Sequence, residues 1–112
     1  MLEISLKAAD QLAKEGVEAE IIDLRSLRPL DMEPVIESFK RTNLAVVVEE
    51  GWPSFGIGAE VSARIYEQAF DYVDAPIKRV AQKEVPLPYN RNLEQMALPQ
   101  VADVIAAVKE VL

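Results

Sequence analysis

The sequence predicts an α/β fold in which helices cover a mainly parallel sheet. Residues 44–48 (LAVVV) form an uninterrupted apolar run, as expected for a strand that is buried on both faces. A glycine-containing loop and a helix at about residues 58–71 follow this strand directly. A buried strand that leads into a helix is typical of a parallel sheet, because the crossover connections place helices over its faces.

The remaining elements alternate between helix and strand. Gly16 followed by Val17 is expected to end the first helix with a Schellman turn. Asp31 is expected to cap the second helix, with Pro34 in its first turn. The other predicted elements are helices at about 2–15, 32–39 and 101–112, strands at 19–24 and 77–81, and a proline-marked loop at 86–90.

The sheet predicted in this way is narrow. Three strands are few for four helices, and the chain begins with a helix where a β/α unit begins with a strand. We therefore expect further strands to precede Met1 or to come from another chain, and the open edge to be prone to pairing with another copy.

Composition limits the possible functions. The 112 residues, half of them hydrophobic, are expected to form one domain over residues 1–112. The formal charge of -7 disfavours nucleic acid and anionic membranes as partners and permits a basic protein. The chain has no Cys and no His, which excludes disulfides, Ser-His-Asp catalysis and Cys-His catalysis. No general base for catalysis near neutral pH is evident.

The loop at Gly56 and Gly58 is the first candidate site. It lies between a strand and a helix, where backbone N–H groups of a nucleotide-binding protein hold a phosphate, and Arg25 or Arg28 could add positive charge. Val61 stands where a third glycine would be needed, which favours a purely structural loop. The two arginines could instead pair with Asp23, Asp31 or Glu49 to fix the loop, and this structural role is favoured.

Two adjacent carboxylates follow the central strand. Paired carboxylates can share acid and base roles. Glu49 and Glu50 are neighbours on a strand, so their side chains are expected to point to opposite faces and not to converge.

Aromatic residues are more numerous than a small core needs. The segment VPLPYNRN could present Tyr89 as part of an extended proline-rich ligand, but a packed connection with Tyr89 at the edge of the core is favoured. An exposed aromatic patch would instead mark an interface. The aromatic residues concerned are Trp52, Phe55, Phe70, Tyr72 and Tyr89.

Three motifs together resemble a known family. They are VEEGWPSFGIGAE, FDYVDAP and PLPYNRNLE, within a match that spans essentially the whole chain. In this combination they resemble the C-terminal domain of pyruvate dehydrogenase β subunits, a domain of the transketolase C-terminal type. They resemble the pyruvate enzyme more than its branched-chain or acetoin relatives. The segment Val80–Pro86 departs from the family pattern.

The resemblance implies a three-layer α/β/α sandwich that is truncated at its N-terminal strands. It implies no catalytic residue, cofactor-binding residue or metal ligand in this chain, because thiamin diphosphate and Mg are bound elsewhere in the full enzyme. Whether the chain is itself an enzyme is left open. The compartment implied is the bacterial cytoplasm or the mitochondrial matrix.

The resemblance also implies partners. These are an α subunit and a second β subunit in an α2β2 heterotetramer, and the peripheral subunit-binding domain of the dihydrolipoyl acyltransferase. The residues expected to contact partners are Asp74, the carboxylate of Leu112, and Trp52. The alternative is a freestanding anion- or nucleotide-binding module that uses the Gly56–Gly58 loop.

Overall fold

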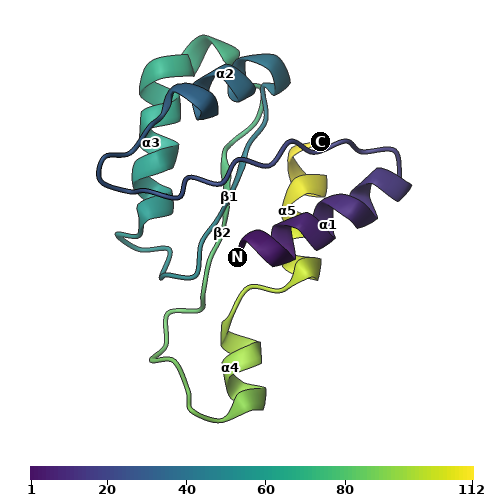
Figure 1. Ribbon diagram of the computed structural model, residues 1–112, viewed down its shortest axis with the longest axis vertical. Helices are drawn as coiled ribbons and strands as arrows, with labels where there is room; N and C mark the ends of the chain where they lie inside the picture. The colour runs from purple at the N-terminus through teal and green to yellow at the C-terminus, as the bar shows by residue number, and fades with distance from the viewer.

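A computed structural model describes residues 1–112 and shows helices on both faces of a small parallel sheet (Figure 1). Strand β1 (Val46–Val48) pairs with β2 (Lys78–Val80), with Val46 opposite Lys78 and Val48 opposite Val80. Helices α2 (Glu33–Thr42) and α3 (Ile57–Ala69) lie on one side of the sheet, and α1 (Leu2–Lys14) and α5 (Val101–Val111) lie on the other. The predicted α/β/α layering is confirmed.

The alternation of side chains along β1 explains the two layers of core. Val47 packs against the cluster formed by α2 and α3, while Val46 and Val48 pack against the cluster formed by α1, β2 and α5. Successive strand residues point to opposite faces, so one apolar strand serves both helical layers. The buried residues of the first cluster are Met32, Ile36, Phe39, Val61, Ile65 and Ala69, and those of the second are Ala8, Val80, Val104 and Ala107.

The predicted end of the first helix is confirmed, whereas the predicted cap of the second helix lies one residue away from the N-cap position. After α1, Gly16 has φ of 84°, and the N–H groups of Gly16 and Val17 donate to the carbonyls of Ala13 and Leu12. This is the hydrogen-bond pattern of a Schellman turn. Asp31 Oδ1 accepts from the N–H of Glu33 at 3.0 Å, although the residue in the N-cap position of α2 is Met32.

The predicted strand at 19–24 is wrong. These residues run as an extended segment but pair with no strand (Figure 1). Glu20 accepts hydrogen bonds from the Ser38 hydroxyl (2.7 Å) and from Arg41 Nη2 (2.9 and 3.0 Å). The Ser38 hydroxyl first, and then Arg41, hold the pKa of the Glu20 carboxyl below its ordinary value.

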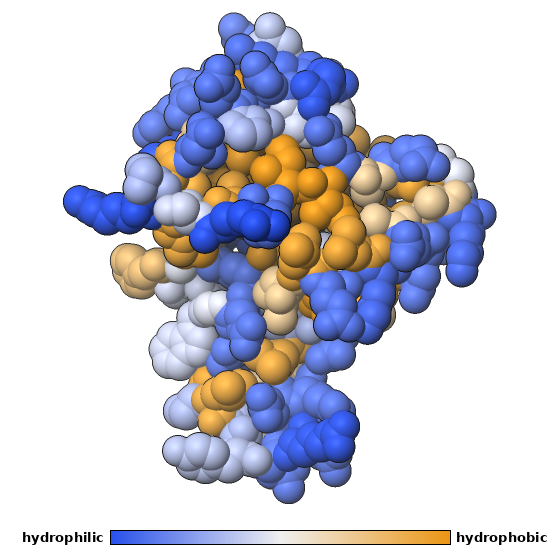
Figure 2. Space-filling model, in the orientation of Figure 1, coloured by the Kyte–Doolittle hydropathy of each residue, from blue (hydrophilic) through white to orange (hydrophobic).

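An apolar cavity of about 660 Å³ lies between this extended segment and the sheet. Residues 17–25 line it on one side, residues 44–48 on another, and apolar side chains of α1 and α5 close it further. Figure 2 shows apolar residues gathered at the centre of this face. Since β1 has β2 as its single sheet neighbour, the two-stranded sheet agrees with the expected truncated sandwich.

The C-terminal third contains one helix that the sequence analysis missed. Helix α4 (Arg91–Ala97) follows the proline-marked loop and projects from the body (Figure 1). Asn90 caps it by accepting from the N–H groups of Asn92 (3.0 Å) and Leu93 (3.3 Å). Tyr89 is fully exposed here, so the prediction that it lies at the edge of the core is wrong.

The long helix after β1 is confirmed with a small change at its end. Residues 70–72 form a 3-10 turn, η1 (Phe70–Tyr72), and do not continue α3.

No helix in the chain is both long and apolar enough to span a membrane.

Candidate functional site

The segment that leaves β1 carries a buried carboxylate. Glu49 is 7% exposed, and its N–H donates to the carbonyl of Val80 at 2.9 Å, which extends the sheet by one position. Glu49 Oε2 accepts from the N–H of Gly58 at 3.1 Å, whereas Oε1 has no hydrogen-bond partner. Glu50 is exposed. The two carboxylates therefore do not converge, as predicted, and they form no acid–base pair.

The Glu49 carboxylate fills the space beside the Gly56–Gly58 loop. A Cβ added at Gly58 would overlap Glu49 Oε1 and lie 3.0 Å from its Cδ. A Cβ added at Gly56 would overlap the carbonyl of Trp52 and lie 2.9 Å and 3.0 Å from the two Glu49 oxygens. The missing Cβ atoms make room for this chain's own carboxylate. A phosphate at the start of α3 would meet a negative charge at close range, which opposes the anion-binding alternative.

The two arginines do not join this loop. Arg25 Nε pairs with Asp23 Oδ2 at 3.2 Å and is largely exposed. Arg28 is exposed and makes no ion pair. The structural role that sequence analysis favoured for Arg25 is confirmed, because its partner is the neighbouring acidic residue.

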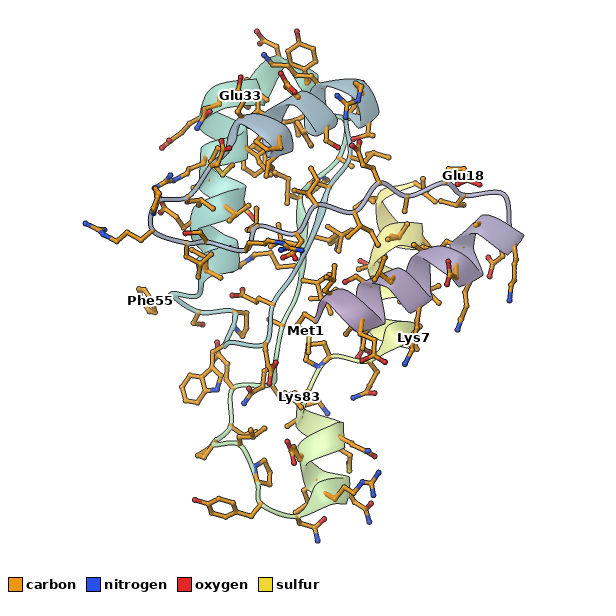
Figure 3. All side chains as sticks on the ribbon, viewed as in Figure 1. Met1, Lys7, Glu18, Glu33, Phe55 and Lys83 are labelled. Atoms are coloured by element: carbon orange, nitrogen blue, oxygen red, sulfur yellow. The ribbon has the colours of Figure 1, made fainter.

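Trp52 belongs to an exposed apolar face that two distant segments build together. Its indole N–H donates to the carbonyl of Val85 at 3.3 Å, which joins the loop after β1 to the segment after β2. We call this surface the Trp52 face; it consists of Trp52 and Val85, which are both exposed. Phe55 and Leu87, in the same two segments, are also exposed. Figure 3 shows Phe55 pointing away from the body of the protein. Exposed aromatic and aliphatic side chains are typical of protein interfaces.

Asp74 and Leu112 lie at the other end of the sheet. The N–H of Asp74 donates to the carbonyl of Asn43, just ahead of β1, at 3.3 Å. Lys78, the first residue of β2, pairs with Glu110 at 2.6 Å, two residues before Leu112. Both Asp74 and Leu112 are exposed. The structure therefore brings these two predicted residues to the end where the strands begin, whereas Trp52 follows the end where β1 finishes.

Sequence reasoning missed the residues that hold the Trp52 loop. Arg79 Nη1 donates to the carbonyl of Pro53 at 2.7 Å, and Glu84 Oε1 accepts from the N–H of Ser54 at 3.1 Å. These partners are 26 and 30 residues apart in the chain. A local sequence pattern therefore cannot predict these contacts. The buried position of Glu49 had a usable signal, which is an acidic residue at the end of an apolar strand followed by two closely spaced glycines.

The residues of this chain do not fit a thiamin diphosphate or metal site. No three acidic side chains lie together in a way that could hold a metal ion. The one loop whose sequence suits a diphosphate is filled by Glu49.

Comparison with known proteins supports the family resemblance. The family model described as "Transketolase, C-terminal domain" matches residues 1–104. The chain is 53% identical to the pyruvate dehydrogenase E1 component subunit beta of Rhizobium meliloti over 107 residues, which are 96% of this chain and 23% of the relative. It is 52% identical to the mitochondrial subunit beta of Dictyostelium discoideum (95% of this chain, 30% of the relative). It is 49% identical to the pyruvate dehydrogenase E1 component subunit beta of Rickettsia felis (98% of this chain, 34% of the relative).

The chain thus spans about a quarter to a third of the length of these relatives. The resemblance to pyruvate dehydrogenase β subunits is confirmed by relatives of bacterial and mitochondrial origin at about half identity. From the family model and the layered α/β/α fold together, we conclude that this chain belongs to the transketolase C-terminal domain family.

Proposed function

We propose that this chain is a non-catalytic assembly domain of a pyruvate dehydrogenase β subunit. In that role it supports thiamin-diphosphate-dependent oxidative decarboxylation of pyruvate to acetyl-CoA without holding the reacting groups. The observation that carries the proposal is the pair of exposed surfaces at opposite ends of the sheet, on a chain that resembles such subunits along 95–98% of its length.

The end that carries Asp74 and Leu112 is the proposed docking surface for the acyltransferase core. Its partner is the peripheral subunit-binding domain, and the formal charge of -7 on this chain suits a basic docking domain. The Asp74 carboxylate and the carboxylate of Leu112 are the groups proposed to receive basic side chains. Their common end of the sheet allows one small domain to contact both.

The Trp52 face is the proposed contact with other subunits of the decarboxylating component. The proposed partners are an α subunit and a second β subunit. A large exposed aromatic side chain anchored by a hydrogen bond suits an interface centre, because it buries much area and loses little conformational freedom. Thiamin diphosphate and Mg are proposed to bind to other parts of the full enzyme.

Docking is tested by titrating the subunit-binding domain into this chain in a calorimeter. Asp74→Lys is expected to weaken binding by at least about tenfold, because a charge that pairs across the interface becomes repulsive. Asp71→Lys is the matched control, since it makes the same charge change at another exposed position nearby. Equal affinity of the Asp74→Lys variant and the unmodified chain would refute the docking role.

Contact through the Trp52 face is tested by co-purification with an α subunit. Trp52→Ala is expected to reduce the recovered α subunit, and Phe70→Ala, which removes an exposed aromatic ring elsewhere, is expected to leave recovery unchanged. Equal recovery of the α subunit with both variants would refute the proposed contact through the Trp52 face.

A further inference from the structure

The Glu49 carboxylate is buried without an ionic partner. Buried carboxylates are almost always paired, yet none of the six ion pairs includes Glu49. Its single side-chain hydrogen bond comes from the backbone N–H of Gly58. A group that is this costly to bury needs a structural reason for its place.

The Glu49 side chain lies at the N-terminus of α3. The N-cap residue of this helix is Gly56, which has no side chain to accept from the first free N–H groups. Glu49 reaches from the end of β1 and accepts from Gly58, the second residue of the helix. A negative charge at a helix N-terminus is also favoured by the helix dipole. The carboxylate thus links the sheet to the helix across the base of the intervening loop.

The loop between these two anchors carries Trp52. On its outer side, residues 52–54 are held by the hydrogen bonds to Val85, Arg79 and Glu84. On its inner side, the Glu49 carboxylate lies against Gly56 and Gly58, where even a methyl group has no space. The loop is therefore clamped between the segment after β2 and one buried side chain.

We propose that Glu49 is a positioning residue that holds the loop of residues 50–56 in place, so that the Trp52 face is formed before any partner binds. A preformed face avoids the entropic cost of ordering a loop on association. The inference depends on the proposed function in one respect, namely that a partner binds to this face. The positioning itself is a property of the isolated chain and is tested there.

Trp52 supplies the readout, because it is the single tryptophan of the chain. Glu49→Met keeps a side chain of similar length but removes the acceptor oxygens, and Glu49→Gln keeps one oxygen for Gly58. Glu50→Met is the matched control, since it makes the same change at the adjacent exposed carboxylate. The measurements are Trp emission, its quenching by acrylamide, and near-UV circular dichroism, all well below the unfolding temperature.

We expect Glu49→Met to shift Trp52 emission to longer wavelength and to raise the quenching constant. The rise is limited to about twofold, because the side chain is already 47% exposed. Glu49→Gln is expected to restore most of the unmodified signal, and Glu50→Met to leave it unchanged. A Glu49→Met variant with unchanged helical circular dichroism and unchanged Trp52 signals would overturn the inference.

A second measurement applies should Glu49→Met fail to fold. In the unmodified chain, the amide of Gly58 is expected to exchange with solvent more slowly than the amide of Ala102, which holds the equivalent second position of α5. Equal exchange of the two amides would overturn the positioning role. No partner is present in the fluorescence or the exchange experiment. A negative result in either would therefore refute the positioning role of Glu49 without refuting the proposed contact between the Trp52 face and an α subunit.

Discussion

Gly58→Ala is expected to destabilise the fold, although the same change in the interior of most helices stabilises it. Replacing glycine by alanine within a helix usually gains about 0.5–1 kcal/mol. Here the new Cβ would overlap Glu49 Oε1 and lie 3.0 Å from Glu49 Cδ and 3.4 Å from Val47 Cγ1. Displacing the carboxylate costs about 1.5–3 kcal/mol, the range for a hydrogen bond to a charged group and for overpacking. The net loss in unfolding free energy is about 0.5–2.5 kcal/mol.

The assay is urea unfolding followed by Trp52 fluorescence and by far-UV circular dichroism. Coincidence of the two transitions supports a two-state analysis. The decisive measurement is the same substitution in a Glu49→Ala background, where the space beside Gly58 is empty. There Gly58→Ala is expected to stabilise by about 0.5–1 kcal/mol, so that the sign of its effect reverses.

A control glycine separates this effect from ordinary backbone strain. Gly16 has φ of 84° and no atom within 4 Å of an added Cβ. Gly16→Ala is therefore expected to cost about 1 kcal/mol in both backgrounds, through its left-handed conformation alone. If Gly58→Ala had the same effect with and without the Glu49 side chain, the reasoning about this loop would be refuted.

Three further predictions concern the packing and electrostatics of the body. Leu12→Ala is expected to cost about 2–5 kcal/mol in urea unfolding, because Leu12 is 1% exposed and its removal leaves a cavity; a cost near zero would contradict this packing. Asn90→Ala is expected to destabilise α4 by about 1 kcal/mol, because the N–H of Asn92 loses its acceptor. The measurement is the loss of helical NMR chemical shifts in residues 91–97, with the shifts of α5 unchanged. The pKa of Glu20 is lowered in the folded state, so its stabilisation is present above the pKa of the unfolded chain and is lost as pH falls through the lower folded value. Ser38→Ala is expected to raise that pKa in an NMR titration and to weaken this acid dependence, and an unchanged titration curve would show that the hydroxyl is not its main cause.

Much of the fold follows from local patterns that the chain carries in short windows. The apolar run at 44–48 predicts a strand buried on both faces, and the structure places Val46 and Val47 against opposite helical layers. Gly16 and Val17 predict the end of the first helix because the Schellman turn is a local hydrogen-bond pattern. Such features depend on neighbours within a few residues and are therefore readable from the sequence.

The errors arose where local preference competes with distant contacts. Residues 19–24 have the composition of a strand, but a strand also needs a neighbour with which to pair, and here Glu20 is held by side chains of α2. Helix α4 gave no core signal because its apolar residues Leu93 and Met96 remain exposed. Tyr89 was expected at the core for its aromatic ring, yet the loop that carries it stands away from the body.

The sequence by itself determined the layered α/β architecture, the family, and the absence of histidine and cysteine chemistry. The tertiary structure decided where the exposed surfaces lie: Asp74 and Leu112 are both near the end of the sheet where the strands begin, and Trp52 is at the other end. It also showed that Glu49 occupies the space beside Gly58, where a phosphate-binding loop would need to be open. The physical reason is that helix and strand periodicity are local, whereas burial of a charge and assembly of a surface depend on contacts between segments far apart in the chain.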